Sequence, residues 1–194
     1  MSTKVNTPEF RVAFPQVFRP KKNDLNGKDE FSVVALFKKG ISLALLEKAA
    51  EAAMEKKWGA NHNKWPKGLR SPFRNQGDRA KTNDEGVETM PQGYEKGAIY
   101  LNLRSAQRPG VVDQDVQDII DESSFYGGCW ARASINAFAY DVKGNKGVAF
   151  GLGNIQKLRD GDAFGNRTKP EEDFSPVENN EANATSQTAN SLFT

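Results

Sequence analysis

The amino-acid sequence predicts a mainly β protein, a small barrel of five antiparallel strands with one helix between the second and third strands. Five segments alternate apolar and polar residues in the way that is typical of strands, whereas one segment carries apolar residues at helical spacing. The longest strand has one face of small apolar residues, which suits the crowded interior of a narrow barrel.

The first two strands are predicted at residues 10–18 and 31–38, joined by a polar turn into a hairpin. The first has apolar residues of one parity: Phe10, Val12, Phe14 and Phe18. Pro15 lies inside it and cannot donate a ladder hydrogen bond, which predicts an edge strand or a bulge. The second alternates in the same way through Phe31, Val33, Ala35 and Phe37.

A helix is predicted at residues 42–58, followed by Gly59 as its stop. Its apolar residues recur at helical spacing: Leu45, Leu46, Ala49, Ala50, Ala53 and Met54. Residues 59–97 are rich in glycine and lack periodicity, so we expect a long irregular insertion there. Loops of that length are uncommon in a domain unless they have a function or are disordered.

The remaining strands are predicted at residues 98–104, 129–141 and 148–152, with 155–158 closing the core. Residues 143–147 have the glycines of a hairpin turn. The acidic stretch 113–122 fits either a strand or a short helix. This inventory favours an OB-type barrel over a β-sandwich, which usually needs more strands, although OB folds more often place their helix after the third strand.

Charge divides the chain into a predicted DNA-binding domain at 1–170 and a disordered acidic tail at 171–194. The tail has five acids and no Lys or Arg, which leaves 27 basic and 20 acidic residues in the first segment. The tail has too few apolar residues to offset the entropy of ordering. A basic body suggests a polyanionic partner.

Several classes of function are disfavoured by what the sequence lacks. One cysteine and one histidine allow no internal disulfide and no Cys/His zinc site, and neither a cofactor nor a metal ion is expected. Neither a membrane-spanning run nor a signal peptide is recognised, so a cytoplasmic protein is expected. A catalytic Cys–His pair is allowed by the count, but Cys129 lies in an apolar stretch typical of a buried thiol.

The strand at 129–141 provides the main argument for function. Its odd positions are small and apolar, and its even positions include Trp130, Arg132, Phe138 and Tyr140. The strand at 98–104 repeats this pattern with Tyr100, Asn102 and Arg104. Exposed rings stack on unpaired bases and arginine neutralises phosphate, which predicts binding of single-stranded DNA. In the alternative, Trp130 and Phe138 are ordinary core residues beneath the helix or the insertion.

A second cluster, between residues 56 and 81, interleaves cations with aromatic rings and has one acid. Its candidate DNA-binding residues are Trp65, Lys67, Arg70, Phe73 and Arg74. The alternative is a solvated basic loop that its aromatic residues anchor to the body. Lys143 and Lys146, in the hairpin turn, are further candidates for phosphate contacts.

Two other functions are open to the same sequence. Asp113, Asp115 and Asp141 could form a metal-dependent nuclease site, although their spacing is loose. A strand-annealing or protein-interaction factor would use the insertion and the tail to dock a partner. Leu192 and Phe193, an apolar pair at the end of the acidic tail, are the candidate partner-binding residues.

The segments 125–133 and 141–152, which read FYGGCWARA and DVKGNKGVAFGL, resemble a family of single-stranded DNA-binding proteins of bacteriophages and prophages. The resemblance spans residues 8–160 and extends more distantly to OB-fold proteins of short-tailed phages, in which a helix separates the second and third strands. Relatives of that kind commonly end in an aromatic residue, whereas Thr194 follows Phe193 here.

This resemblance implies a non-enzymatic protein that coats single-stranded DNA during phage replication and recombination in a bacterial host, infected or lysogenic. It also implies that the tail contacts phage or host replication proteins. From the residues alone we expect binding that is independent of base sequence, and a monomer or weak dimer.

Overall fold

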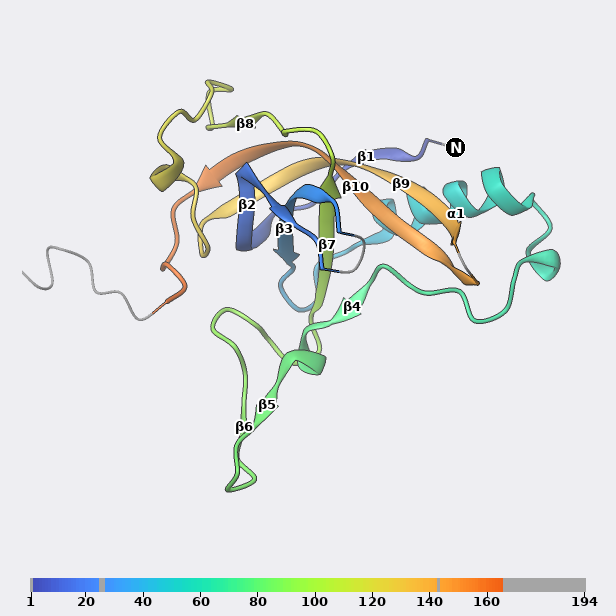
Figure 1. Ribbon diagram of the computed structural model, residues 1–194, viewed down its shortest axis with the longest axis horizontal. Coiled ribbons are helices and arrows are strands. Elements are labelled where there is room, and N and C mark those ends of the chain that lie inside the picture. Colours follow the sequence, from blue (N-terminus) through green and yellow to red (C-terminus); the bar gives the residue numbers. More distant parts are fainter. Residues whose placement is uncertain (1, 25–26, 143, 166–194) are drawn as a thin grey trace, which may run out of the picture. The chain divides into compact units, whose positions relative to one another are not determined.

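The computed structural model describes residues 2–24, 27–142 and 144–165, and five long strands in this part of the chain close into a barrel (Figure 1). They are β2 (Phe10–Lys22), β3 (Asp29–Leu36), β7 (Ile99–Ser105), β9 (Trp130–Val142) and β10 (Asn145–Arg159). Their order around the barrel is β2-β3-β7-β10-β9, and β9 pairs again with β2. The OB-type barrel that the sequence predicts is therefore confirmed.

One pairing in the barrel is parallel, whereas the sequence predicted antiparallel strands throughout. β7 and β10 run in the same direction, with Phe150 opposite Leu103 and Gly151 opposite Arg104. The reason is the chain topology. β9 and β10 form a hairpin, and β10, the second strand of the hairpin, lies beside β7 and runs in the same direction. The other four pairings are antiparallel.

Short elements extend the barrel at its edges. β1 (Lys4–Asn6) pairs with β9, β4 (Arg74–Asn75) with β7, and β8 (Val111–Val112) with β10. β5 (Lys81–Thr82) and β6 (Glu88–Thr89) form a separate two-stranded sheet. Three single turns of 3₁₀ helix complete the set: η1 (His62–Lys64), η2 (Gln76–Arg79) and η3 (Glu122–Ser124). The stretch 113–122, which the sequence left between strand and helix, is mostly irregular: Asp118 forms an isolated bridge with Val112, and Glu122 begins η3.

A bulge in β2 changes which of its side chains face the core. The register between β2 and β3 shifts between Ala13 and Gln16, around Pro15, so the predicted bulge is present. The edge-strand alternative is wrong because β2 pairs with both β3 and β9. Phe14 has a positive φ of 46° and is 67% exposed, whereas Val17 is buried. The predicted parity is therefore wrong at Phe14, because the extra residue of a bulge turns a side chain to the other face, whereas Phe18 packs against the core as predicted.

The helix α1 (Ala44–Trp58) packs against β9 and ends where predicted, at Gly59 with a φ of 86°. The small residues Ala49, Ala50 and Ala53 are buried in the core beside Leu46. Leu45 is exposed, contrary to the sequence prediction, and Ala52 is buried in its place. One apolar side chain at the start of the helix therefore lies outside the packed stripe.

The insertion at residues 59–97 is irregular, as predicted, but it is attached to the barrel. The backbone N–H of Arg70 donates to Lys146 O at 2.9 Å, and that of Val148 donates to Arg70 O at 3.1 Å. Further along, β4 pairs with β7. These contacts place the middle of the insertion beside the β9–β10 hairpin.

The chain divides by internal contacts into a unit of Met1–Phe164 and a second unit of Gly165–Thr194. The barrel and the insertion belong to the first. The predictions for the acidic tail at 171–194 lie outside the described residues. None of the described helices is long and apolar enough to cross a membrane.

Candidate nucleic-acid interface

A groove of about 670 Å³ crosses the barrel between the β2–β3 turn and the β9–β10 hairpin. Five residues that the sequence singled out line it together: Arg74, Asn102, Arg104, Phe138 and Tyr140. They come from β4, β7 and β9, which are far apart in the sequence. Closure of the barrel is what brings these three strands to one surface.

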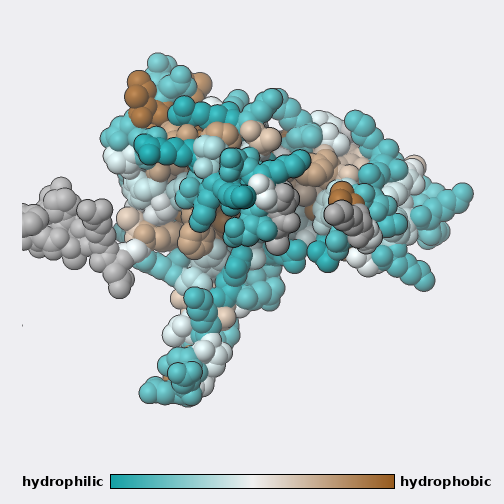
Figure 2. Space-filling model, in the orientation of Figure 1, coloured by the Kyte–Doolittle hydropathy of each residue, from teal (hydrophilic) through white to brown (hydrophobic). Residues whose placement is uncertain are grey.

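Two smaller hollows continue the groove across β3 and β2. One, of about 310 Å³, shares Asn102 and Arg104 with the groove and adds Phe14. The other, of about 200 Å³, shares Asn23, Glu30 and Arg104 with the groove and adds Lys21 and Lys22 at the end of β2. The face of the molecule in view is largely hydrophilic (Figure 2). We call these three connected hollows the barrel groove.

The barrel groove runs across the strands. Gln16 pairs with Ser32, Ser32 with Arg104, and Arg104 with Gly151, so these residues form a row perpendicular to the strand direction. Gly151 pairs in turn with Asn136 on β9, so the row covers five strands. Neighbouring strands lie about 4.8 Å apart, which makes the row about 19 Å long. A path of this length accommodates a short run of nucleotides, as in other OB folds.

Aromatic side chains are exposed at both ends of the barrel groove. Phe138 on β9 is 45% exposed, and Tyr140 lies two residues further on the same face. Phe14 on β2 lies at the other end. The alternative that Phe138 is an ordinary core residue is wrong, because the odd positions of β9 face the interior and Phe138 faces out. These three rings are therefore accessible for stacking.

The cations of the barrel groove differ in how far their charge is neutralised. Arg104 Nη1 lies 3.4 Å from Glu30 Oε2, and Asn23 donates to the same oxygen at 2.7 Å. Arg74 is exposed and makes no ion pair with the residues that the structure describes. At the hairpin, Lys146 Nζ is paired with Asp141 at 3.2 Å. Arg74 is thus more available to a phosphate than Arg104, whose charge is shared with Glu30.

The chain matches one protein-family model, described as Enterobacter phage Enc34, ssDNA-binding protein, over residues 3–185. The chain belongs to this family. Putative protein p50 of Acyrthosiphon pisum secondary endosymbiont phage 1 is similar to it, with 30% identity over 166 residues that cover 83% of this chain and 86% of the relative. The resemblance to phage single-stranded DNA-binding proteins that the sequence indicated is therefore confirmed.

Solved structures of two phage proteins share the fold. The single-stranded DNA-binding protein of bacteriophage Enc34, solved in complex with ssDNA, matches with a TM-score of 0.64 and 18% identity, over 84% of this chain and 90% of that one. The gp2.5 single-stranded DNA-binding protein of bacteriophage T7 matches with a TM-score of 0.52 and 11% identity, over 86% and 97%. At these identities the likeness shows the fold.

Two aromatic residues that the sequence placed on the DNA-binding face are buried in this family member. Tyr100 is 6% exposed, since Tyr94 and Arg79 of the insertion pack against its ring. Trp130 is 8% exposed, and the cations of Arg11, Lys38 and Arg159 lie over its ring. The expectation that these rings are exposed on the even face is wrong, because other segments cover the ends of both strands.

Three more candidates lie away from the barrel groove. Arg132 donates to Gln156 at 2.8 Å near β8, at the opposite end of β9 from Tyr140. Trp65 stacks on His62, and Phe73 packs edge-on against the core residue Phe150. Phe73 thus contacts the barrel, as the alternative of an anchored loop expects, whereas these contacts of Trp65 lie within the insertion.

The remaining candidate DNA-binding and partner-binding residues either lie beside the barrel groove or fall outside the described residues. Lys67 and Arg70 are exposed on the segment that leads to the groove, but neither lines it. Lys143 lies outside the described residues, as do Leu192 and Phe193.

The acids of the proposed nuclease site do not come together. Asp113 O accepts from Gln156, which pairs with Arg132, whereas Asp141 lies nine residues beyond Arg132 on β9. At about 3.3 Å per residue this separation is roughly 30 Å along the strand. The side chain of Asp113 instead accepts from the backbone N–H groups of Asp115 and Gln117, which is a turn motif.

Cys129 is fully buried in the core, and burial raises the pKa of its thiol above the ordinary value. The thiolate is the reactive form of cysteine, so a raised pKa and a buried sulfur both oppose nucleophilic chemistry. The reading of Cys129 as a structural thiol is consistent with this environment.

Sequence reasoning missed two contributors to the barrel groove, Phe14 and Lys21. Phe14 was assigned to the core because its parity matched that of Phe10. Pro15 was the available signal, since a proline within a strand marks a bulge, and bulges turn a side chain toward another face. A positive φ in a bulky residue is strained and persists only where the surroundings enforce it.

Proposed function

We propose that the barrel groove binds single-stranded DNA without preference for base sequence. The single observation that supports this best is the groove itself, which assembles exposed rings and arginines from three distant segments on one face of an OB-type barrel. The related phage proteins are single-stranded DNA-binding proteins, one of them solved in complex with ssDNA, and this supports the proposal.

Stacking on Phe138, Tyr140 and Phe14 would supply the contacts to bases. Every base has a flat π-face, so stacking of this kind tolerates any sequence and contributes about 1–3 kcal/mol per base. The three rings lie on β2 and β9, at the two ends of the row that crosses the barrel. A strand laid along the groove would meet all three.

Phosphate neutralisation would come from Arg74, Arg104 and Lys21. Each cation that contacts a phosphate releases condensed counterions. For single strands, the logarithm of the binding constant therefore falls by about 0.7 per contact for each tenfold rise in salt concentration. The Arg104–Glu30 pair would have to open or share its charge, whereas Arg74 is available at once. By this function the protein would coat and protect single-stranded DNA during phage replication and recombination.

The decisive experiment measures affinity for oligo-dT against salt concentration in Phe138→Ala and Arg74→Ala. Loss of the ring should weaken binding by about 5–150-fold, which corresponds to 1–3 kcal/mol. The salt dependence of Phe138→Ala should stay unchanged, because no phosphate contact is lost. Arg74→Ala should instead reduce the salt slope by about 0.7.

Matched controls come from the same chain. Arg132→Ala removes an exposed arginine from β9 outside the groove, and Ile120→Ala removes an apolar side chain that is 91% exposed. Hydrophobic atoms gather on the segment that contains Ile120, between β8 and η3 (Figure 2). Both controls should bind as the unchanged protein does. If Arg132→Ala weakened binding as much as Arg74→Ala, the groove would be the wrong face.

A further inference from the structure

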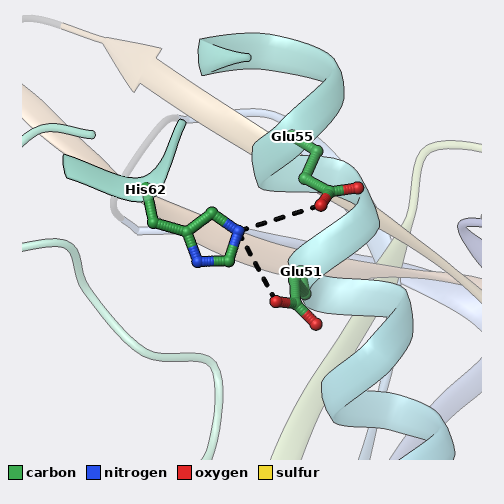
Figure 3. A group of neighbouring side chains, drawn as sticks. All are labelled: Glu51, Glu55 and His62. Carbon is green, nitrogen blue, oxygen red and sulfur yellow. Dashed lines mark ion pairs between the residues drawn. The ribbon is translucent and has the colours of Figure 1, made fainter. Parts of the chain in front are cut away.

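Three side chains near the C-terminal end of α1 converge on one point (Figure 3). Glu51 and Glu55 are one helical turn apart and therefore lie on the same side of α1. His62 comes from η1, and its Nε2 lies 3.6 Å from Glu51 Oε1 and 3.8 Å from Glu55 Oε1. One potential ligand atom from each residue lies within 4.8 Å of the other two.

The chain reverses direction after α1 in a way that holds His62 over the helix. Gly59 ends α1 with a positive φ of 86°, a conformation that favours glycine. The side chain of Asn61 then accepts from the backbone of Asn63 and starts η1. Trp65 Nε1 donates to Gly59 O at 2.7 Å, and the Trp65 ring stacks on the imidazole with centroids 4.0 Å apart. The imidazole is therefore supported on its face, with Nε2 directed at the carboxylates.

We infer that Glu51, Glu55 and His62 form a binding site for one divalent transition-metal ion of the zinc class. Such ions accept imidazole nitrogen and carboxylate oxygen at about 2.0–2.2 Å, which in a tetrahedron separates neighbouring ligand atoms by roughly 3.4 Å. The distances of 3.6 and 3.8 Å from Nε2 are close to this spacing. Three protein ligands leave the fourth position to water, and two carboxylates balance the charge of the ion.

The electrostatics of the helix support an occupant of positive charge. Two carboxylates at positions i and i+4 repel each other and destabilise a helix by a few tenths of a kcal/mol. A cation bound between them removes that repulsion. A proton on the His62 imidazole would also reduce the repulsion between the two carboxylates. The experiment must therefore distinguish a bound metal ion from a proton.

The position of the site suggests what the ion would do. His62 lies near the start of the insertion. The backbone of the insertion reaches β10 at Arg70, and its strand β4 carries Arg74 into the barrel groove. Ligands from both α1 and η1 would fix the start of the insertion to the helix. The metal site is independent of the proposed DNA binding, because none of its three residues lines the groove.

His62 is the only histidine in the sequence, so its imidazole can be observed without any substitution. The full chain, free of any histidine tag and stripped with a chelator, is titrated with Zn²⁺ while the imidazole NMR signals are recorded at constant pH. Saturable movement of these signals with one Zn²⁺ per chain is expected. Signals that stay in place at millimolar Zn²⁺ would overturn the proposal.

Isothermal titration of variants tests the ligand set. Glu51→Gln and His62→Gln should each weaken Zn²⁺ binding by more than 10-fold, since even outer-shell partners of metal ligands commonly account for 10–100-fold. Glu47→Gln, one turn earlier on α1 and outside the three-residue group, removes the same charge and should leave the affinity unchanged. Equal affinity in all three variants would place the bound ion elsewhere, for instance on the acids of residues 171–181, and would overturn the site.

Discussion

At the scale of single residues, the structure depends on a buried polar side chain that no sequence pattern marks. Gln76 is 1% exposed and joins three segments. Its Nε2 donates to Phe37 O and Ile99 O, both at 2.8 Å, and its Oε1 accepts from the backbone of Glu95 at 2.8 Å. Burial of an amide is favourable only when its hydrogen bonds are made, so this residue locks the insertion against β7.

Replacement of Gln76 by Leu should therefore destabilise the protein. The change removes three hydrogen bonds and leaves Phe37 O and the backbone N–H of Glu95 without this partner, whereas Ile99 O still accepts from the backbone N–H of Phe37 at 3.0 Å. Each buried polar group that loses its partner costs about 1–3 kcal/mol. Because the losses are not additive, we expect about 3 kcal/mol in the free energy of unfolding, measured by urea denaturation. Gln107→Leu, at an exposed position, should stay within about 0.5 kcal/mol. Equal stability of the two variants would show that the Gln76 hydrogen bonds are replaced easily.

At the scale of elements, the β9–β10 hairpin contributes to the core, the groove and the attachment of the insertion. The odd residues of β9 fill the core while Phe138 and Tyr140 face the groove. The backbone of β10 binds that of Arg70, and this contact is close. A Cβ added at Gly147 would lie 2.5 Å from Arg70 O and 2.9 Å from the hydroxyl of Tyr140. Gly147 is thus required by the neighbouring backbone.

The variant Gly147→Ala should push the insertion away from the hairpin. Overpacking of this kind costs about 1–3 kcal/mol, which lowers the Tm of a protein of this size by about 2–12 °C. Binding of ssDNA should weaken as well, because Arg74 follows on the displaced segment. Gly151→Ala on the same strand meets its nearest atoms at 3.7 Å and serves as the control for thermal unfolding. A Tm of Gly147→Ala equal to that of the control would contradict the close contact.

At the scale of the whole molecule, charge is distributed unevenly along the chain. Residues 1–170 carry 27 Lys and Arg against 20 acids, and residues 171–194 carry five acids and no Lys or Arg. A polyanionic segment attached to a basic body competes with nucleic acid for the same cations. The sequence thus predicts that the acidic tail reduces the affinity of the body for DNA.

Deletion of residues 171–194 should strengthen ssDNA binding at low salt. This gain in affinity should shrink as the salt concentration rises. Salt screens the attraction between the tail and the basic body, just as it screens the attraction between DNA and the body. Fluorescence titration with oligo-dT at 20 mM and 300 mM NaCl measures both. A control in which the five acids are replaced by their amides separates charge from length. Unchanged or weaker binding after deletion would argue against competition by the tail.

Local patterns were sufficient for the elements of the barrel and for part of the groove. Alternation in 98–104 and 129–141 identified β7 and β9, and the same alternation placed Asn102, Arg104 and Phe138 on their exposed side. Prediction failed where another segment intervenes. Tyr100 and Trp130 share the parity of those residues, yet they are buried because Tyr94 and a group of cations cover them.

The sequence by itself determined the OB-type barrel, the place of the helix, the family and the basic character of the body. These depend on period, composition and motifs that are local in the chain. Only the tertiary structure decided which exposed residues share one surface, that Phe14 turns outward at its bulge, and that His62 meets Glu51 and Glu55. Contacts of this kind depend on the register between strands and on the path of the insertion, and neither is encoded by the periodicity of any one segment.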